Sequence, residues 1–150
     1  MQAKNIPARM RGFSLIELMV VIGVVAILSA IALGAYRQYM VRTNRTDGTM
    51  VLLKLQAAEE KYFLQNNTYT ASLGTDGIAV TGGTGVTSMT TAGGYYTIGV
   101  AAGSTATLAT SYLATATAIA GQAKDTTCPK LTIDDQGIHG PSSTAATCWH

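Results

Sequence analysis

The feature that most constrains this chain is an uncharged apolar stretch near the N-terminus, from Leu18 to Ala35. Wound as a helix with a rise of about 1.5 Å per residue, this stretch nearly crosses a hydrocarbon core of about 30 Å. Three basic residues and no acidic residue precede it: Lys4, Arg9 and Arg11. This distribution predicts one membrane helix whose N-terminus stays in the cytoplasm.

One carboxylate, that of Glu17, lies directly before the apolar stretch. A carboxylate placed in hydrocarbon costs on the order of 2.5–3.5 kcal/mol on insertion scales, so such a residue indicates a function by default. A plain membrane anchor does not explain it. In a second interpretation, Glu17 lies among the lipid headgroups and caps the helix, since the N-terminal end of the helix dipole favours a negative charge.

A cleavable secretory signal is another interpretation of the apolar stretch. Such a signal has a short apolar region followed by a small-x-small cleavage site, and residues 30–32 (Ala-Ile-Ala) have that form. Here the apolar run is longer, and the small residue Gly12 lies before the run rather than after it. This order favours a segment that is kept in the mature protein.

Residues 11–18, Arg-Gly-Phe-Ser-Leu-Ile-Glu-Leu, resemble the prepilin signature of type IV pilins and pseudopilins at every position. The resemblance implies that a membrane prepilin peptidase cleaves between Gly12 and Phe13 and then methylates the new amino group of Phe13. It also implies that Glu17 pairs with the N-terminal amine of a neighbouring subunit during assembly. A buried ion pair is weak evidence for stability, but it can fix a register.

After Ala35 the chain continues as an amphipathic helix, and we predict one helix over residues 13–65, on the order of 80 Å long. Four apolar residues fall near one face at helical spacing: Met50, Leu53, Ala57 and Leu64. We expect a sheet to cover this face. Four charged residues are expected to point away from it: Lys54, Glu59, Glu60 and Lys61.

A loop rich in glycine and threonine is expected from Asn66 to Gly94. Alternating patterns then predict strands over residues 95–100, 111–120 and 130–134, with a short fourth strand near Ile138. The expected fold is therefore α+β, with the long N-terminal helix packed on an antiparallel sheet of about four strands. This order, with a C-terminal disulfide loop, resembles the type IVa pilin fold, although many such pilins carry proline at the place of Gly34.

The two cysteines, Cys128 and Cys148, both lie on the side of the membrane segment that the leader charges predict to be exported. Two cysteines in an oxidising compartment most simply form one disulfide. Two free thiols or a metal site are the alternatives, but no His/Cys cluster has the spacing of a zinc site.

Charge and composition give no indication of nucleic-acid binding or catalysis. The chain has 10 Lys+Arg and 8 Asp+Glu, and removal of residues 1–12 leaves 7 basic and 8 acidic side chains. The formal positive charge is thus a leader effect, and we do not expect nucleic acid as a direct, specific ligand. We find no catalytic constellation and expect no enzyme, no cofactor and no metal site; Asp134 and Asp135 alone supply too few ligands for calcium.

Residues 128–149 and 62–70 resemble PilE-type minor pilins of Gram-negative bacteria. The resemblance implies a structural subunit of a type IV pilus and favours a minor pilin, with twitching motility, cell adhesion and DNA uptake as family roles. The expected organisation is a leader over residues 1–12, a transmembrane and filament-core helix over 13–40, and a globular head over 41–150.

The implied partners are other pilin subunits, the prepilin peptidase and the inner-membrane assembly machinery. The expected location is the inner membrane before assembly, with a cytoplasmic N-terminus and a single pass, and the extracellular pilus afterwards. A major pilin, a pseudopilin of type II secretion, and a tip adhesin or DNA-uptake binding module are the alternatives. The Cys128–Cys148 loop argues against the pseudopilin, because such loops are typical of pilins.

Overall fold

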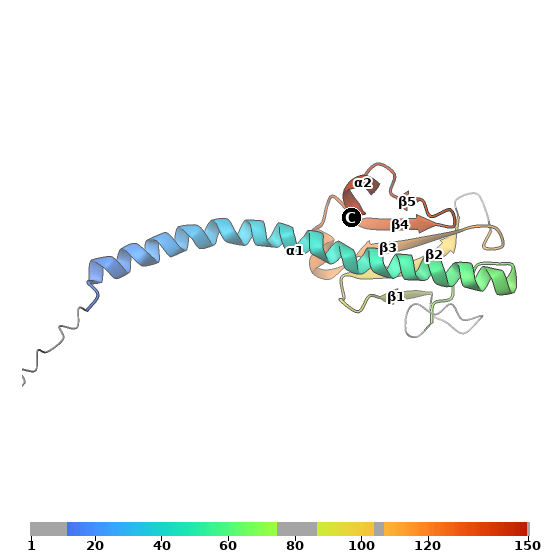
Figure 1. Ribbon diagram of the computed structural model, residues 1–150, viewed down its shortest axis with the longest axis horizontal. Coiled ribbons are helices and arrows are strands. Elements are labelled where there is room, and N and C mark those ends of the chain that lie inside the picture. Colours follow the sequence, from blue (N-terminus) through green and yellow to red (C-terminus); the bar gives the residue numbers. More distant parts are fainter. Residues whose placement is uncertain (1–11, 75–86, 104–106, 150) are drawn as a thin grey trace, which may run out of the picture. The chain divides into compact units, whose positions relative to one another are not determined.

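The computed structural model describes residues 12–74, 87–103 and 107–149. The chain divides into two compact units, Met1–Gln38 and Tyr39–His150. Helix α1 (Leu15–Asn66) starts in the first unit and ends in the second (Figure 1). The prediction of one long helix is confirmed, and the helix continues through Gly34 without a break.

In the first unit, α1 is exposed on all sides. Every side chain from Phe13 to Gln38 is exposed to solvent. By length and composition, α1 contains a segment that is apolar enough to cross a membrane. Since almost every residue of this segment is apolar, no stripe distinguishes one face from another.

The second unit contains a five-stranded sheet with the order β1-β2-β3-β4-β5, in which each neighbouring pair is antiparallel. The strands are β1 (Ser88–Thr90), β2 (Tyr96–Ala102), β3 (Tyr112–Ala118), β4 (Lys130–Asp134) and β5 (His139–Gly140). A 3-10 turn, η1 (Ala120–Lys124), and a short helix, α2 (Ala145–Cys148), complete the order.

Strands β2 to β5 correspond to the four strands that the sequence predicts, and β1 is an addition. Strand β1 lies within the segment predicted as a loop, and it is only three residues long. Three residues are too short to show the alternation of side chains that marks a strand in the sequence. The strand is visible only through its pairing with β2, where Met89 lies opposite Ile98.

The core lies between α1 and one face of the sheet, as Figure 1 shows for the second unit. The inward side chains of the central strands alternate along the chain, as the period of two requires. The buried apolar side chains of these elements are Leu52 and Leu55 from α1, Tyr96, Ile98 and Val100 from β2, Tyr112, Ala114 and Ala116 from β3, and Leu131 and Ile133 from β4. At Gly48 the helix comes so close to the sheet that a Cβ would lie 3.1 Å from both Leu131 and Tyr96.

The predicted covered face of the helix is wrong. Met50, Leu53 and Leu64 remain 50 %, 47 % and 83 % exposed, whereas Glu59 is completely buried. Lys54 and Lys61 are exposed as expected. The sheet instead covers a face that carries Arg45, Gly48, Thr49, Leu52, Leu55 and Glu59. Gly48 allows a close approach, and Arg45 and Glu59 find polar partners in the head, so fit and pairing decide this face rather than hydrophobicity alone.

Candidate functional site

The residues of the prepilin signature lie at the exposed start of α1. Gly12 and Phe13 precede the helix, Phe13 is 85 % exposed, and Glu17 lies in the first turn. The amide of Leu18 donates the opening hydrogen bond to the carbonyl oxygen of Ser14, at 3.2 Å. Residues 1–11 of the expected leader lie outside the described residues. Cleavage after Gly12, methylation of Phe13 and the pairing of Glu17 therefore stay predictions.

The first unit presents an unusually large apolar surface. Its large apolar side chains are each half exposed or more: Phe13, Leu15, Ile16, Leu18, Met19, Val20, Val21, Ile22, Val24, Val25, Ile27, Leu28, Ile31 and Leu33. Water-soluble monomers rarely expose contiguous apolar patches of more than a few hundred Å². This surface requires cover from lipid or from other protein chains.

A disulfide joins Cys128 to Cys148 and closes the C-terminal part of the head, with the two Cα atoms 5.7 Å apart. Both cysteines are buried. The disulfide loop, residues 128–148, contains β4, β5 and α2. The structure thus has the disulfide expected from the sequence, and neither free thiols nor a metal site at these positions.

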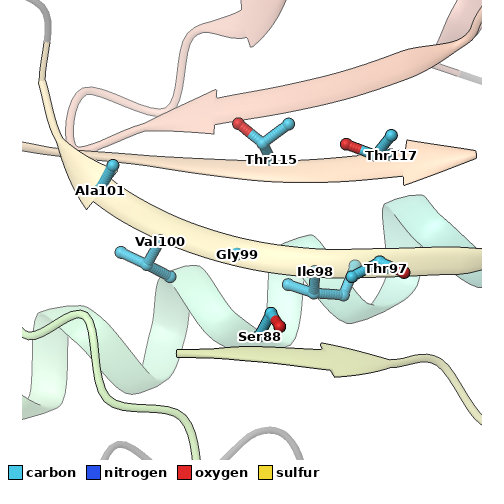
Figure 2. A pocket seen from close by; sticks show the side chains of 8 residues that line it. All are labelled: Ser88, Thr97, Ile98, Gly99, Val100, Ala101, Thr115 and Thr117. Atoms are coloured by element: carbon cyan, nitrogen blue, oxygen red, sulfur yellow. The ribbon is translucent and has the colours of Figure 1, made fainter. Parts of the chain in front are cut away.

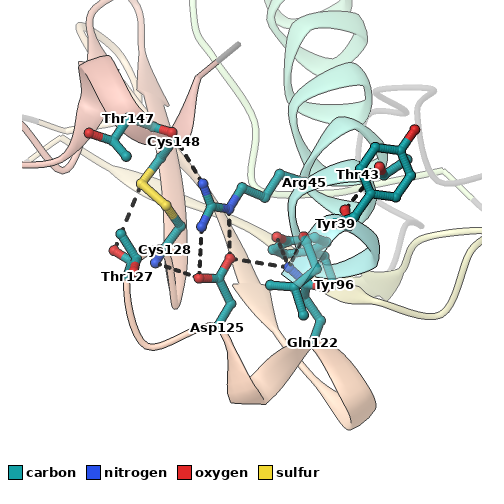
Figure 3. A network of polar contacts seen from close by, with 11 residues as sticks. Tyr39, Thr43, Arg45, Tyr96, Gln122, Asp125, Thr127, Cys128, Thr147 and Cys148 are labelled. Carbon is teal, nitrogen blue, oxygen red and sulfur yellow. Dashed lines mark hydrogen bonds and ion pairs between the residues drawn. A yellow bond between two sulfur atoms is a disulfide. The ribbon is translucent and has the colours of Figure 1, made fainter. Parts of the chain in front are cut away.

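A buried ion pair joins α1 to Asp125, three residues before the disulfide loop, and a further hydrogen bond from the same arginine reaches the other end of the loop (Figure 3). Arg45 Nε and Nη2 donate to Asp125 Oδ2 and Oδ1 at 2.7 and 2.9 Å, so the contact is bidentate. Arg45 Nη1 donates to the carbonyl oxygen of Thr147 at 3.1 Å. Asp125 Oδ1 also accepts the backbone N–H of Cys128 at 3.1 Å. Paired, charge-assisted hydrogen bonds of this kind are the strong ones.

Burial by itself raises the pKa of Asp125, but hydrogen bonds from Arg45 and from the Cys128 amide outweigh it and hold the pKa below its usual value. Gln122 completes the surroundings of the ion pair. Its Nε2 lies 2.9 Å from the carbonyl oxygen of Val41, 3.1 Å from the Tyr96 hydroxyl and 3.2 Å from Asp125 Oδ2. The carboxylate therefore stays ionised and oriented at neutral pH.

Sequence reasoning missed Arg45, Gln122 and Asp125. The ion pair joins residues 80 positions apart, and no spacing rule connects them. Arg45 also follows two other basic residues, Arg37 and Arg42, from which nothing in the sequence distinguishes it. Only the arrangement of α1 beside η1 shows which arginine has a buried partner.

A second polar contact fastens the chain that follows α1 back onto the helix end. Glu59 Oε2 accepts the backbone N–H of Thr70 at 3.1 Å, and Oε1 has no hydrogen-bond partner. Burial raises the pKa of Glu59 to about 7. Tyr69 donates its hydroxyl to Glu60 and stacks on Phe63, with the ring centres 4.6 Å apart. The sequence placed Glu59 on the exposed side, so this contact was also missed.

A groove of about 300 Å³ lies over β1, β2 and β3 (Figure 2). Its walls carry hydroxyl groups, small residues and the apolar residues Ile98 and Val100. Gly99 lies between Ser88 and Thr115 in the register of the strands. None of its lining residues is charged. Phosphate recognition rests on positive charge, so the groove does not have the chemistry of a nucleic-acid site.

Among the residues that the structure describes, no three His, Cys, Asp or Glu side chains gather in a way that would hold a metal ion. The two carboxylates considered for calcium have other contacts. Asp134 Oδ1 accepts the backbone N–H groups of Gln136 and Ile138 at 3.0 and 2.8 Å, and Asp135 accepts the hydroxyl of Ser111. Asp134 thus stabilises the turn between β4 and β5, and Asp135 joins this turn to the residue before β3.

Comparison with known families gives two adjoining matches. Residues 34–132 match the family described as "Type IV minor pilin ComP, DNA uptake sequence receptor", and residues 7–33 match the prokaryotic N-terminal methylation motif. The first match covers about two thirds of the chain. The chain belongs to this family of type IV minor pilins. Pilins are structural proteins, and the apolar helix and the methylation motif of this pilin indicate membrane anchoring and pilus assembly.

Curated relatives match this pilin over less than half of its length. Prepilin peptidase-dependent protein D of Escherichia coli K12 is 45 % identical over 58 residues, which are 39 % of this chain and 40 % of the relative. Fimbrial protein EcpC of Eikenella corrodens is 37 % identical over 71 residues, 47 % of this chain and 46 % of the relative. The pilin spans less than half the length of each of these relatives.

The type IV major pilin protein PilE1 of Neisseria gonorrhoeae is 35 % identical over 69 residues, 46 % of this chain and 42 % of the relative. A solved type IV pilin from Shewanella oneidensis is similar, with a TM-score of 0.49 and 19 % identity. The aligned region covers 73 % of this chain and 98 % of the solved chain.

Proposed function

We propose that this chain is a structural subunit of a type IV pilus, a minor pilin whose apolar helix packs against the helices of other subunits in the fibre. The observation that carries the proposal is the exposed apolar surface of the first unit, on which every side chain from Phe13 to Gln38 is uncovered. Lipid covers such a surface before assembly, and neighbouring helices cover it in the fibre.

The proposed maturation removes residues 1–12 and leaves Phe13 as an N-methylated N-terminus. The filament-core helix then covers residues 13–40, and the head covers residues 41–150. In the inner membrane, the N-terminus faces the cytoplasm. The prepilin peptidase and the assembly machinery act on the chain at this membrane. Glu17 meets the amine of a neighbouring Phe13 and so sets the stagger between subunits.

The exposed face of α1 within the head supports assembly with other subunits. Met50, Leu53, Ala57 and Leu64 remain uncovered by the sheet, although they lie near one side of the helix. An apolar stripe that is exposed to water does not stabilise a subunit that acts alone. We propose that neighbouring subunits cover this stripe in the fibre.

The first test is the intact mass and N-terminal residue of the protein from sheared surface fibres. An N-methylated Phe13 and a mass two hydrogens below that of the dithiol would support a processed subunit, and the amount relative to other subunits would separate minor from major pilin. A chain that begins after Ala32, or one that keeps Met1 in the membrane, would overturn the proposal. A processed protein that is absent from fibres but required for secretion would indicate a pseudopilin instead.

DNA uptake is the second candidate function, and the family description favours it. The charges of the described head support it too, because the basic and acidic side chains differ in exposure. Five basic side chains are exposed: Arg42, Lys54, Lys61, Lys124 and Lys130. The acidic side chains of the described head are all buried or half-buried: Asp47, Glu59, Glu60, Asp125, Asp134 and Asp135.

This difference bears on the expectation that nucleic acid is not a ligand. That expectation counted charges along the sequence, where the two signs nearly balance. A polyanion interacts most strongly with exposed charges. Two acidic residues, Asp125 and Glu59, and one basic residue, Arg45, lie in the interior. The exposed charge of the described head is therefore more positive than the count along the sequence.

The test measures the binding of duplex DNA to the full chain in detergent micelles as salt is varied. Replacement of Lys124 and Lys130 by glutamine is expected to weaken binding and to lower the salt slope by roughly one for each phosphate that is no longer neutralised. The matched control replaces the same two lysines by arginine, which keeps the charge. Equal affinity and slope in the glutamine variant would exclude these lysines, and no binding by the wild type would exclude the function.

A further inference from the structure

The Arg45–Asp125 ion pair and the disulfide hold the same two parts of the chain. Asp125 lies three residues before Cys128, and Thr147 lies directly before Cys148. Arg45 contacts both residues from its position on α1 (Figure 3). Arg45 therefore links the same two segments of the chain that the disulfide joins, although it does so through other atoms.

None of these polar contacts involves a sulfur atom. The guanidinium donates to the Asp125 carboxylate at 2.7 and 2.9 Å and to the Thr147 carbonyl oxygen at 3.1 Å. The Cys128 amide donates to the same carboxylate at 3.1 Å. The four donors and three acceptors of these hydrogen bonds are present before the disulfide forms, so the dithiol chain can make the same contacts.

The ion pair is buried and is linked to α1 by a further side chain. Arg45 is 8 % exposed and Asp125 is 3 % exposed, so solvent hardly competes for their hydrogen bonds. Gln122 links Asp125 to the carbonyl oxygen of Val41, one helical turn before Arg45. A planar guanidinium offers two parallel donors to a carboxylate and a further donor to a third group, which the point charge of lysine cannot reproduce.

We propose that Arg45 is a positioning residue for disulfide formation, which brings Cys128 and Cys148 together while both are still thiols. With oxidised glutathione as the oxidant, one cysteine thiolate attacks the glutathione disulfide and releases one glutathione. The second cysteine thiolate then displaces the other glutathione. Two protein thiols become one disulfide, and their two electrons and two protons leave with the two glutathione thiols. The disulfide thus locks a loop that is already in place, and this inference does not depend on the proposed function.

The experiment measures the thiol–disulfide equilibrium of the full chain in detergent micelles against glutathione, with thiols counted by alkylation and mass. The quantity compared is the effective concentration of one cysteine thiol relative to the other, which follows from the equilibrium with glutathione. Arg45→Met is expected to lower it by about tenfold or more, since hydrogen bonds to charged groups are removed, and Arg45→Lys is expected to give an intermediate value. The matched control is Arg42→Met, the same change at an exposed position of α1, and it should leave the value unchanged. Equal values for Arg45→Met and wild type would overturn the proposal.

A second measurement covers the case in which Arg45→Met does not fold. The variant with Cys128→Ser and Cys148→Ser keeps Arg45 and lacks the disulfide, and the hydrogen exchange of the residue 128 amide reports the bond to Asp125. Retained protection of this amide, and its loss when Arg45→Lys is added, would support the proposal. Loss of protection in the serine variant alone, either locally or with the whole head, would show that the ion pair needs the disulfide and would overturn it.

Discussion

The two halves of α1 belong to one helix but are stabilised in different ways. Before Tyr39 the helix is exposed on every side, and from Leu18 to Ala35 it carries no charge. After Tyr39 one face is buried against a sheet, and that face carries Arg45 and Glu59 as well as Leu52 and Leu55. Composition alone therefore specifies the apolar character of the first half, whereas contacts with particular partners select the buried face of the second half.

The largest effect is expected from a charge in the first half. Glu17→Gln removes the carboxylate, and a neighbouring N-terminal amine would then be buried without a partner. Removing one member of a buried ion pair costs about 3–5 kcal/mol, so incorporation into fibres should fall by about a hundredfold or more. Immunoblots of sheared fibres against membranes would measure this. The control is Arg37→Gln, and equal incorporation of both variants would exclude the assembly role of Glu17.

The buried face of the second half is tested by two neighbouring leucines. Leu52 is completely buried and Leu53 is 47 % exposed. Leu52→Ala should lower the free energy of unfolding of the head by about 2–5 kcal/mol, and Leu53→Ala should change it by less than about 0.5 kcal/mol. Thermal or denaturant unfolding of both variants in the same detergent would measure the difference. Equal losses would contradict the arrangement of α1 on the sheet.

Glu59 makes the stability of the second half depend on pH. Because burial raises its pKa to about 7, the folded chain binds more protons than the unfolded chain between about pH 4.5 and 7. The contribution of Glu59 to stability should therefore be largest below that range and fall as pH rises through it, by up to about 3 kcal/mol, whereas the contribution of Asp125 is lost only in acid.

Denaturant unfolding between pH 4 and 8 would measure this loss. Glu59→Gln should flatten the profile. Glu60→Gln should reduce its slope only slightly, since the charge of Glu60 is a smaller cause of the raised pKa than burial. A difference between wild type and Glu59→Gln that does not change between pH 4.5 and 7 would show that the pKa of Glu59 is not raised in the fold.

The smallest effects come from the same substitution in the two halves. Gly48→Ala introduces a Cβ that would lie 3.1 Å from Leu131 and Tyr96, so it should destabilise the head by about 1–3 kcal/mol. Gly34→Ala meets nothing within 4 Å and should favour the helix by roughly 0.5–1 kcal/mol. Unfolding followed by circular dichroism would compare the variants, and an equal sign for both would remove the distinction between the halves.

Four features of the described chain could be predicted from the sequence: the long helix, its apolar first half, four of the five strands and the cysteine pair. These features depend on local composition and on periods of 3.6 and 2 residues, which are readable along the chain. The prepilin signature from Arg11 to Leu18 is likewise a local pattern, so these eight residues alone are enough to indicate the pilin family.

The buried face of the second half of α1 and the pairing of its charges depend on how the helix packs in the head. The Arg45–Asp125 ion pair joins residues 80 positions apart, and Glu59 meets the Thr70 amide across the end of the helix. Strand β1 exists through its pairing with β2, not through its own pattern. A buried polar group is stable only where it finds a hydrogen-bond or ionic partner. Which groups become partners depends on their positions in space, and no local sequence pattern gives those positions.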